Sequence, residues 1–308
     1  MSELTNTIGF RVFGFTLAIH TNSQSIVEAA LTSFGRFGQV ETPITEPDFV
    51  FYLQAHQQDS GQITPPRFHA EGDLACQTMG QDAVITANLQ TGRAEGQFSP
   101  TVLAQQPFFR FHFLEFAFFV MLSRRGMMGV HGAAVVQQGH AVLLRAQSGG
   151  GKTTLAYAAA RSTFQALAED VVWLDLKRGL WWGRPWSFHL LPDAKTLFPE
   201  LAPYQPVVQT NGEMKLEVDL ETIRAGSTIT CAEPGPVVLV ERLPGGCSRL
   251  EPFSLAEAKP LWDAGRAGNE RSFPEYDHHI TTLLQNNAYR LYFGDDIDAG
   301  VALLQGLL

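Results

Sequence analysis

A glycine-rich run that ends in lysine and threonine constrains this chain more than any other feature. The run AQSGGGKTT spans residues 146–154, after an apolar stretch typical of a strand and at the start of TTLAYAAAR, which is typical of a helix. Glycines let the backbone curl around a phosphate, and the N–H groups of such a loop and of the following helix face the anion. The sequence therefore predicts a phosphate-binding loop, or P-loop, between a strand and a helix.

Each part of this run has an expected task. Lys152 reaches the outer phosphates of a nucleotide, and the hydroxyl of Thr153 binds Mg²⁺. The other residues predicted to contact the phosphates are Ser148, Gly149, Gly150, Gly151 and Thr154. Ala146 stands where the G-x-x-x-x-G-K-[ST] pattern has its first glycine, a change that is tolerated where no positive φ is needed. The alternative is a glycine-rich turn that binds nothing.

An acidic pair and a histidine flank the run in sequence. Glu169-Asp170 ends the next strand-like stretch, which brings the pair back beside the P-loop. One acid can bind Mg²⁺, directly or through water, and the other can accept the proton of an attacking hydroxyl. His131-Gly132 comes one predicted hairpin earlier, and His131 points towards the phosphates if residues 130–136 pair with the P-loop strand. The alternatives are two solvated acids in a turn and a histidine of the core or surface.

These elements together form a known pattern. The 45 residues from Val130 to Leu174 resemble bacterial HPr kinase/phosphorylase, and they look still closer to the HPr-kinase-like serine kinases of lasso-peptide biosynthesis clusters. The shared order is a His-Gly pair, a hairpin, the P-loop and an acidic pair. The resemblance implies an α/β core like that of phosphoenolpyruvate carboxykinase, with the P-loop in a mixed sheet. It also implies ATP and Mg²⁺, and transfer of the γ-phosphoryl group to a serine hydroxyl.

The resemblance also implies a role for each matched residue. Lys152 and Thr153 hold the nucleotide phosphates and the metal, Asp170 lies near the metal, Glu169 is the base, and His131 lies near the phosphates. HPr kinase has Asp in place of Glu169. The family's Gly-Leu-Gly-rich segment and its later arginine-bearing loop have no match here, so phosphorylase activity and HPr recognition are not carried over. The short runs around Arg184 and Lys215 look like runs in the kinase-like relatives, and these two cations are candidates to neutralise transition-state charge.

The rest of the chain predicts two regions. Residues 1–100 read as a smaller α+β region and residues 101–308 as the catalytic domain, with a Phe-rich helix over about 100–125 that bridges them and packs under the second sheet. Strands are predicted at 8–20, 49–54, 130–137, 140–146, 164–168, 171–176, 215–220, 237–241 and 289–293. Helices are predicted at 25–37, 99–125, 193–201, 276–285 and 296–305.

Composition excludes several classes of protein. With a net charge of −9 and five lysines, the chain is a poor candidate for general nucleic-acid binding. The Phe-rich stretch 108–122 is too short and too often interrupted by charge to span a bilayer, and the N-terminus lacks the pattern of a signal peptide. Three widely spaced cysteines suggest a reducing compartment. We therefore expect a cytoplasmic protein that binds neither membrane nor nucleic acid.

The function predicted from these features is an ATP-dependent kinase that acts on a hydroxyl, expected to be a serine of a peptide or protein. A small-molecule hydroxyl kinase and a non-catalytic ATP-binding partner are the alternatives, and a nucleotide hydrolase coupled to motion is a weaker one. The aromatic segment Trp181–Trp186 either covers the nucleotide, receives a peptide or belongs to the core. The sequence predicts no oligomeric state.

Overall fold

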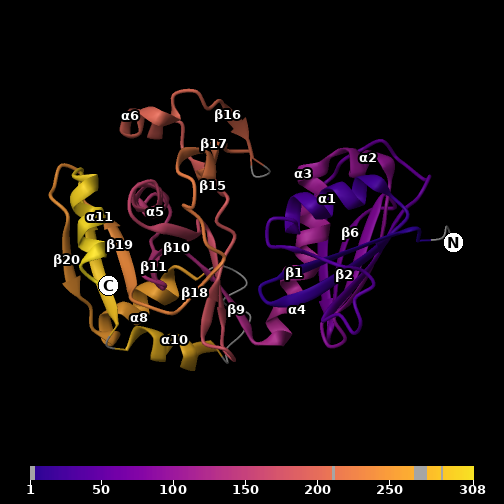
Figure 1. The fold of residues 1–308 in the computed structure, drawn as a ribbon, viewed down its shortest axis with the longest axis horizontal. Coiled ribbons are helices and arrows are strands. Elements are labelled where there is room, and N and C mark those ends of the chain that lie inside the picture. Colours follow the sequence, from indigo (N-terminus) through magenta and orange to yellow (C-terminus); the bar gives the residue numbers. More distant parts are fainter. Residues whose placement is uncertain (1–3, 210–211, 267–275, 286) are drawn as a thin grey trace. The chain divides into compact units, whose positions relative to one another are not determined.

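The computed structural model describes residues 4–209, 212–266, 276–285 and 287–308. The chain forms two compact units, Met1–Gly126 and Met127–Leu308, whose elements are labelled in Figure 1. The division falls after the Phe-rich helical segment and not at residue 100. Every predicted site residue lies in the second unit.

The first unit is built on one sheet of eight strands, in the order β3-β1-β2-β4-β8-β7-β6-β5. Its strands are β1 (Asn6–Val12), β2 (Phe15–Thr21), β3 (Gln39–Val40), β4 (Phe49–Ala55), β5 (Arg67–Glu71), β6 (Leu74–Met79), β7 (Ala83–Asn88) and β8 (Arg93–Phe98). The single strand predicted over 8–20 is wrong, because Phe13 and Gly14 take positive φ values of 51° and 78°. Two successive residues of that kind close a tight hairpin, here between β1 and β2.

Helices of the first unit include α1 (Gln24–Phe34) and the segment after Ser99. That segment is predicted as one helix but consists of α2 (Pro100–Ala104), α3 (Gln106–Phe109), a π-helix (Arg110–Glu115), α4 (Phe116–Leu122) and a 3₁₀ turn (Ser123–Arg125). This segment was predicted to pack under the second sheet. In the structure, the ring of Phe118 packs against those of Phe34 and Phe49 in its own unit. These aromatic contacts hold the segment on the first sheet.

The second unit has a central mixed sheet in the order β12-β10-β11-β19-β21-β20. Its strands are β10 (Ala133–Gln137), β11 (His140–Arg145), β12 (Gln165–Ala168), β19 (Val237–Arg242), β20 (Arg249–Pro252) and β21 (Ala288–Phe293). β11, β19 and β21 run parallel, whereas the β10–β11, β10–β12 and β20–β21 pairings are antiparallel. In β11, Val142 and Leu144 enter one buried cluster while Ala141 and Leu143 enter another, so both faces of the sheet are covered.

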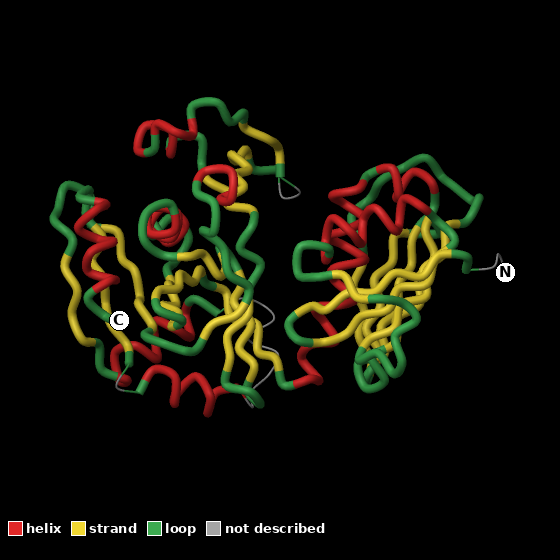
Figure 2. Tube along the Cα trace, viewed as in Figure 1, coloured by secondary structure: helices red, strands yellow, loops and turns green. Residues whose placement is uncertain are grey.

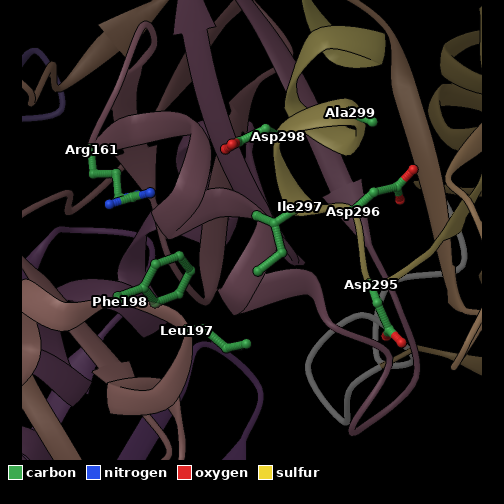
Figure 3. Close-up of a pocket in the computed structure, with 8 residues that line it drawn as sticks. All are labelled: Arg161, Leu197, Phe198, Asp295, Asp296, Ile297, Asp298 and Ala299. Carbon is green, nitrogen blue, oxygen red and sulfur yellow. The ribbon is translucent and has the colours of Figure 1, made fainter.

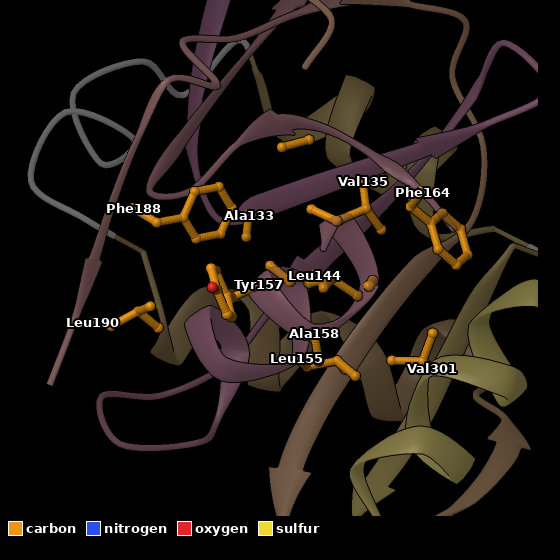
Figure 4. Packing of buried hydrophobic residues seen from close by; sticks show 14 of the residues in the cluster. Ala133, Val135, Leu144, Leu155, Tyr157, Ala158, Phe164, Phe188, Leu190 and Val301 are labelled. Atoms are coloured by element: carbon orange, nitrogen blue, oxygen red, sulfur yellow. The ribbon is translucent and has the colours of Figure 1, made fainter. Parts of the chain in front are cut away.

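Helices α5 (Lys152–Ala160) and α11 (Ile297–Gln305) cover one face of this sheet. Figure 4 shows the contacts, with Leu155 and Ala158 of α5 packed near Val301 of α11. The other face holds α8 (Leu255–Ala264), α10 (Tyr276–Leu284) and a sheet of β9 (Met127–His131), β13 (Val171–Asp175), β14 (Leu180–Trp182) and β18 (Cys231–Ala232). The layers are distinct in Figure 2, where helices and strands differ in colour. Helix α8 was not predicted, because Pro260 lies inside it and reads as a helix breaker.

A third sheet in this unit joins β15 (Ser187–Leu190), β17 (Met214–Asp219) and β16 (Pro206–Val208), with α6 (Ala194–Leu197) and α7 (Leu220–Ile223) beside it. Its inner side chains alternate along β15 and β17 and belong to the same buried cluster as Tyr157 of α5, whose ring contacts that of Phe188. They are Phe188, Leu190, Leu216 and Val218. The helix predicted at 193–201 stops at Leu197, and a separate 3₁₀ turn, Pro199–Leu201, follows.

The strand predicted over 130–137 is two strands. β9 pairs with β13, whereas β10 pairs with β11, and Gly132 separates them. A Cβ atom at Gly132 would lie 2.9 Å from the carbonyl oxygen of Leu144, so only glycine fits at this close approach. His131 therefore sits at the end of β9, two residues before the start of β10, the strand that pairs with β11.

None of the helices within the described ranges has the length and the apolar character that crossing a bilayer requires.

Candidate active site

The glycine-rich run forms the predicted strand–loop–helix. β11 ends at Arg145, the loop follows, and α5 begins at Lys152 with Gly151 as its N-cap. Gly149 and Gly151 have φ values of 77° and 85°, which other residues rarely adopt. The N–H of Gly150 donates to the carbonyl of Gln147 at 2.9 Å and closes the turn. The geometry is that of a loop whose curl is directed by glycine and leads into a helix N-terminus.

Ala146, the departure from the usual pattern, has a direct structural counterpart. A Cβ atom at Gly150 would lie 2.8 Å from the Cβ atom of Ala146, and one at Gly151 would lie 2.9 Å from the ring of Phe293. The methyl group of Ala146 thus fills space that a side chain at position 150 would need. The loop tolerates alanine at position 146 because position 150, whose side chain would need the same space, is glycine.

Lys152 is directed to the acidic pair. Its Nζ donates to the main-chain oxygen of Glu169 at 3.1 Å and lies 3.9 Å from Oδ1 of Asp170, and its side chain is only 10% exposed. Burial lowers the pKa of the Lys152 ammonium, an effect opposed by the charges of the two acids. The Lys152 ammonium is thus a buried cation at the start of α5, and its partners in the structure are one main-chain oxygen and one carboxylate.

The two acids have different surroundings. Glu169 is buried, and the hydroxyl of Thr153 donates to its Oε1 at 3.0 Å. Asp170 is 62% exposed, and its Oδ1 lies 3.2 Å from Nδ1 of His131. The hydrogen bond with His131 holds the pKa of Asp170 below its ordinary value, and Lys152 adds to this effect. The structure thus brings His131, Lys152, Thr153 and both acids together, and it pairs Thr153 with Glu169 instead of Asp170.

Main-chain pairing holds the segment of His131 next to the segment of the acidic pair. The N–H of Gly132 donates to the main-chain oxygen of Asp170 at 2.8 Å, and Val171 stands opposite His131 in the β9–β13 pair. Arg145, which is only 4% exposed, donates to the carbonyl of His131 at 2.9 Å. Nη2 of Arg145 donates to the carbonyls of Trp262 and Gly265 at the end of α8. Arg145 was not predicted as a site residue, since an arginine inside an apolar strand gives no signal of its partners.

His189 and Glu217 were also missed. Nδ1 of His189 lies 3.4 Å from Oε2 of Glu169, and its Nε2 lies 3.5 Å from Oε1 of Glu217. Hydrogen bonding to Glu169 raises the pKa of His189 despite burial, and Glu217 adds to the rise. The available signal was the alternation of polar and apolar residues in SFHL and MKLEVD, which places both side chains on one face of a strand pair.

The two cations predicted to neutralise transition-state charge, Lys215 and Arg184, lie in different surroundings. Lys215 lies on β17, near enough for its charge to act on the pKa values of Lys152 and Asp170, and its Nζ is 3.0 Å from Glu213. Arg184 lies half-buried between β14 and β15, and its role stays a prediction. In the aromatic segment, Trp181 is 3% exposed and belongs to the core.

The donor atoms at the loop suit magnesium. Among the described residues, no group of three or more His, Cys, Asp and Glu side chains is placed to hold a metal ion. Mg²⁺ at kinase sites is bound through one or two carboxylates together with substrate phosphates, and a dedicated protein cage is not required. The hydroxyl of Thr153 and the carboxylate of Asp170 are oxygen donors of this kind, and in the structure the first contacts Glu169 and the second lies near Lys152.

A separate pocket of about 400 Å³ lies between the end of α5 and the start of α11 (Figure 3). Its lining residues are Arg161, Leu197, Phe198, Asp295, Asp296, Ile297, Asp298 and Ala299. None of them belongs to the predicted phosphate site.

Comparisons with known proteins give a distant similarity in structure. No family model and no curated protein matches the chain. Among solved structures, the HPr(Ser) kinase/phosphatase from Coxiella burnetii matches with 12% identity and a TM-score of 0.30, over 58% of this chain and 93% of that one. A similarity at this level does not assign an activity, so the function proposed below depends on the site's own geometry.

Proposed function

We propose that the second unit is an ATP-dependent phosphotransferase that moves the γ-phosphoryl group of ATP to a hydroxyl, expected to be a serine of a peptide or protein. The observation that carries the proposal is the convergence of Lys152 and Thr153, at the start of α5, on Glu169 and Asp170, which directly follow β12. Phosphoryl transfer needs positioning and charge neutralisation more than covalent chemistry from the protein, and this set of groups supplies both.

Each residue has a task in this reaction. The loop backbone and Lys152 bind the phosphates, and Thr153 and Asp170 would hold Mg²⁺, which supplies positive charge to the phosphate oxygens when bound. Glu169 accepts the proton of the acceptor hydroxyl. A bond then forms between the hydroxyl oxygen and the γ-phosphorus, the bond from that phosphorus to the bridging oxygen breaks, and ADP leaves. His131 fixes Asp170 through the contact described above.

Which of the two acids is the base and which binds the metal stays a prediction. Thr153 contacts Glu169 in the structure, and Asp170 is the more exposed of the two. If Glu169 is the base, Glu169→Gln lowers kcat for transfer by about 10²- to 10⁴-fold and leaves ATP affinity nearly unchanged, whereas Asp170→Asn raises the Mg²⁺ concentration needed for half-maximal transfer. If the roles are exchanged, these two results change places.

The proposal is tested by incubating the protein with ATP, Mg²⁺ and a panel of serine peptides, proteins and small hydroxyl compounds, followed by mass spectrometry for one added phosphoryl group. We expect transfer by the wild type and a loss of at least about a hundredfold in Lys152→Ala, because this cation stabilises transferred charge. The matched control is Lys177→Ala, which removes an exposed lysine outside the site.

Two outcomes contradict the proposal. Full activity of Lys152→Ala means that the P-loop is not the site of transfer. Tight ATP binding by the wild type without transfer to any acceptor indicates a non-catalytic ATP-binding protein instead. Transfer confined to a small hydroxyl compound retains the reaction and replaces the acceptor class.

A further inference from the structure

A line of three side chains runs from the P-loop to the outer face of the third sheet. Glu169, His189 and Glu217 follow one another with separations of 3.4 and 3.5 Å between the imidazole nitrogens and the carboxylate oxygens. The exposed fractions of the three side chains rise along the line, from 11% to 29% to 53%. The inner end of the line is thus shielded from water and the outer end is open to it.

Both oxygens of Glu169 are engaged. Oε1 accepts from Thr153 and Oε2 faces His189, so the carboxylate is held from two sides. A glutamate side chain otherwise retains considerable rotamer freedom, which weakens its use as an oriented base. Two contacts on opposite oxygens remove that freedom before a substrate arrives.

We propose that His189 is a positioning residue that fixes the carboxylate of Glu169 for its part in phosphoryl transfer, with Glu217 as the outer anchor of the imidazole. This inference rests on the proposed phosphotransferase activity. His189 and Glu217 stand directly opposite each other in the β15–β17 pair, which sets the outer contact by strand register. The inner contact follows because the same sheet packs on α5, the helix that carries Thr153.

A purely structural role for His189 fits the packing less well. The core side of β15 is made by Phe188 and Leu190, which are 0% and 2% exposed. His189 points to the opposite face, where its partners are the two carboxylates. Its removal is therefore expected to change the site much more than the fold.

The first test compares His189→Ala, His189→Lys and Glu217→Gln in steady-state phosphoryl transfer. His189→Ala is expected to lower kcat about 10- to 100-fold with little change in KM for ATP, as for a misplaced catalytic group. His189→Lys recovers much of the loss, because one ammonium group can contact both carboxylates, and Glu217→Gln gives a smaller loss. The control is His278→Ala, an exposed histidine on α10.

The double variant Glu169→Gln/His189→Ala separates positioning from any other role. If His189 acts through Glu169, the double variant is no slower than Glu169→Gln alone. A full additional loss, an unchanged kcat in His189→Ala, or a loss that only follows a lower Tm would overturn the proposal.

A measurement that needs no turnover tests the contacts of His189 independently of the proposed phosphotransferase activity. We expect the ¹⁵N resonances of the His189 ring, recorded without nucleotide, to shift in both Glu169→Gln and Glu217→Gln. If the wild type transfers no phosphate but these shifts occur, the phosphotransferase proposal fails and the contact line stands. If Glu169→Gln leaves the ring resonances unchanged, the positioning role is wrong whatever the activity.

Discussion

At the scale of single residues, the glycine-rich loop before α5 shows how one departure from the predicted motif is balanced at another position. Ala146 replaces the first glycine of the pattern, and its methyl group lies where a Cβ atom of residue 150 would come within 2.8 Å. Real Cβ atoms do not approach so closely, so Gly150 must stay a glycine while Ala146 is present. The two positions form a pair that the motif alone does not reveal.

Gly150→Ala is therefore expected to weaken ATP binding by about tenfold or more, since a shift of the loop backbone moves the N–H groups off the phosphates. Titration calorimetry with ATP measures this change. The double variant Ala146→Gly/Gly150→Ala should regain part of the affinity, because the closest obstruction is gone. The control is Gly306→Ala at the end of α11, where φ is −68° and the nearest atom would lie 3.6 Å from the added Cβ. Equal ATP affinity in wild type and Gly150→Ala would show that the loop is not the binding element.

Residue spacing was enough to predict part of the site. His131, Lys152, Thr153 and the acidic pair lie within 40 residues of sequence, and a strand, a helix and a return strand bring them to one end of the sheet. His189 and Glu217 could not be predicted, because their strands belong to a third sheet whose position depends on packing against α5. Local patterns determine which face a side chain takes, and long-range packing determines what that face meets.

At the scale of elements, α5 is supported at its C-terminal end by an arginine that directly follows α7. Arg224 donates through Nε and Nη2 to the carbonyl of Ala160 at 3.1 and 2.9 Å, and through Nη2 to that of Phe164. The last carbonyls of a helix have no partner within it, and a cation there also interacts favourably with the helix dipole. This arginine thus stabilises the helix whose other end carries Lys152.

Arg224→Met is expected to lower the free energy of unfolding by about 1–3 kcal/mol, because two carbonyls lose a charged donor. Urea unfolding followed by circular dichroism measures the change. Arg249→Met removes an arginine from an exposed pair with Glu251 and is expected to have an effect of roughly 0–1 kcal/mol. Equal effects of the two substitutions would rule out a capping role for Arg224.

The element least predictable from sequence is the helical segment after Ser99. Its start could be predicted, since the Ser99 side chain accepts from the N–H of Val102 and Pro100 follows. The π-helix Arg110–Glu115 could not, because it accompanies a buried polar group in an otherwise aromatic stretch. Glu115, 5% exposed, accepts from the hydroxyl of Ser33 at 2.8 Å, and Arg110 also donates to that hydroxyl. A π-helical turn of this kind is rare, so a helical sequence pattern does not predict it.

At the scale of the whole molecule, the chain consists of two units with separate cores. Predicted strands and helices of the second unit were largely correct, since its buried strands read as apolar runs between turn residues. The boundary was harder to predict. The apolar face of a Phe-rich helix must pack against another element, but the sequence does not indicate which sheet that is. In the structure it is the sheet of the first unit.

The fragment of residues 127–308 is accordingly expected to fold alone and to bind ATP within a few-fold of the affinity of the full chain. All of the site contacts described above lie inside it. Calorimetry on the purified fragment measures the affinity, with the Lys152→Ala fragment as control. A folded fragment without ATP binding would show that residues 1–126 complete the nucleotide site.

The register of β15 against β17 has a consequence for how this chain tolerates changes in length. His189 and Glu217 share one face with Lys215, while Phe188, Leu190 and Leu216 share the other. A residue inserted within β15 would reverse the two faces beyond it and place a hydrophobic side chain beside Glu169, and one inserted within β17 would place a hydrophobic side chain opposite His189. Residues added at the exposed positions 191–193 or 202–203 of the connection from β15 to β16 would leave that alternation intact. Insertions that preserve activity are therefore expected at these positions and not within β15 or β17.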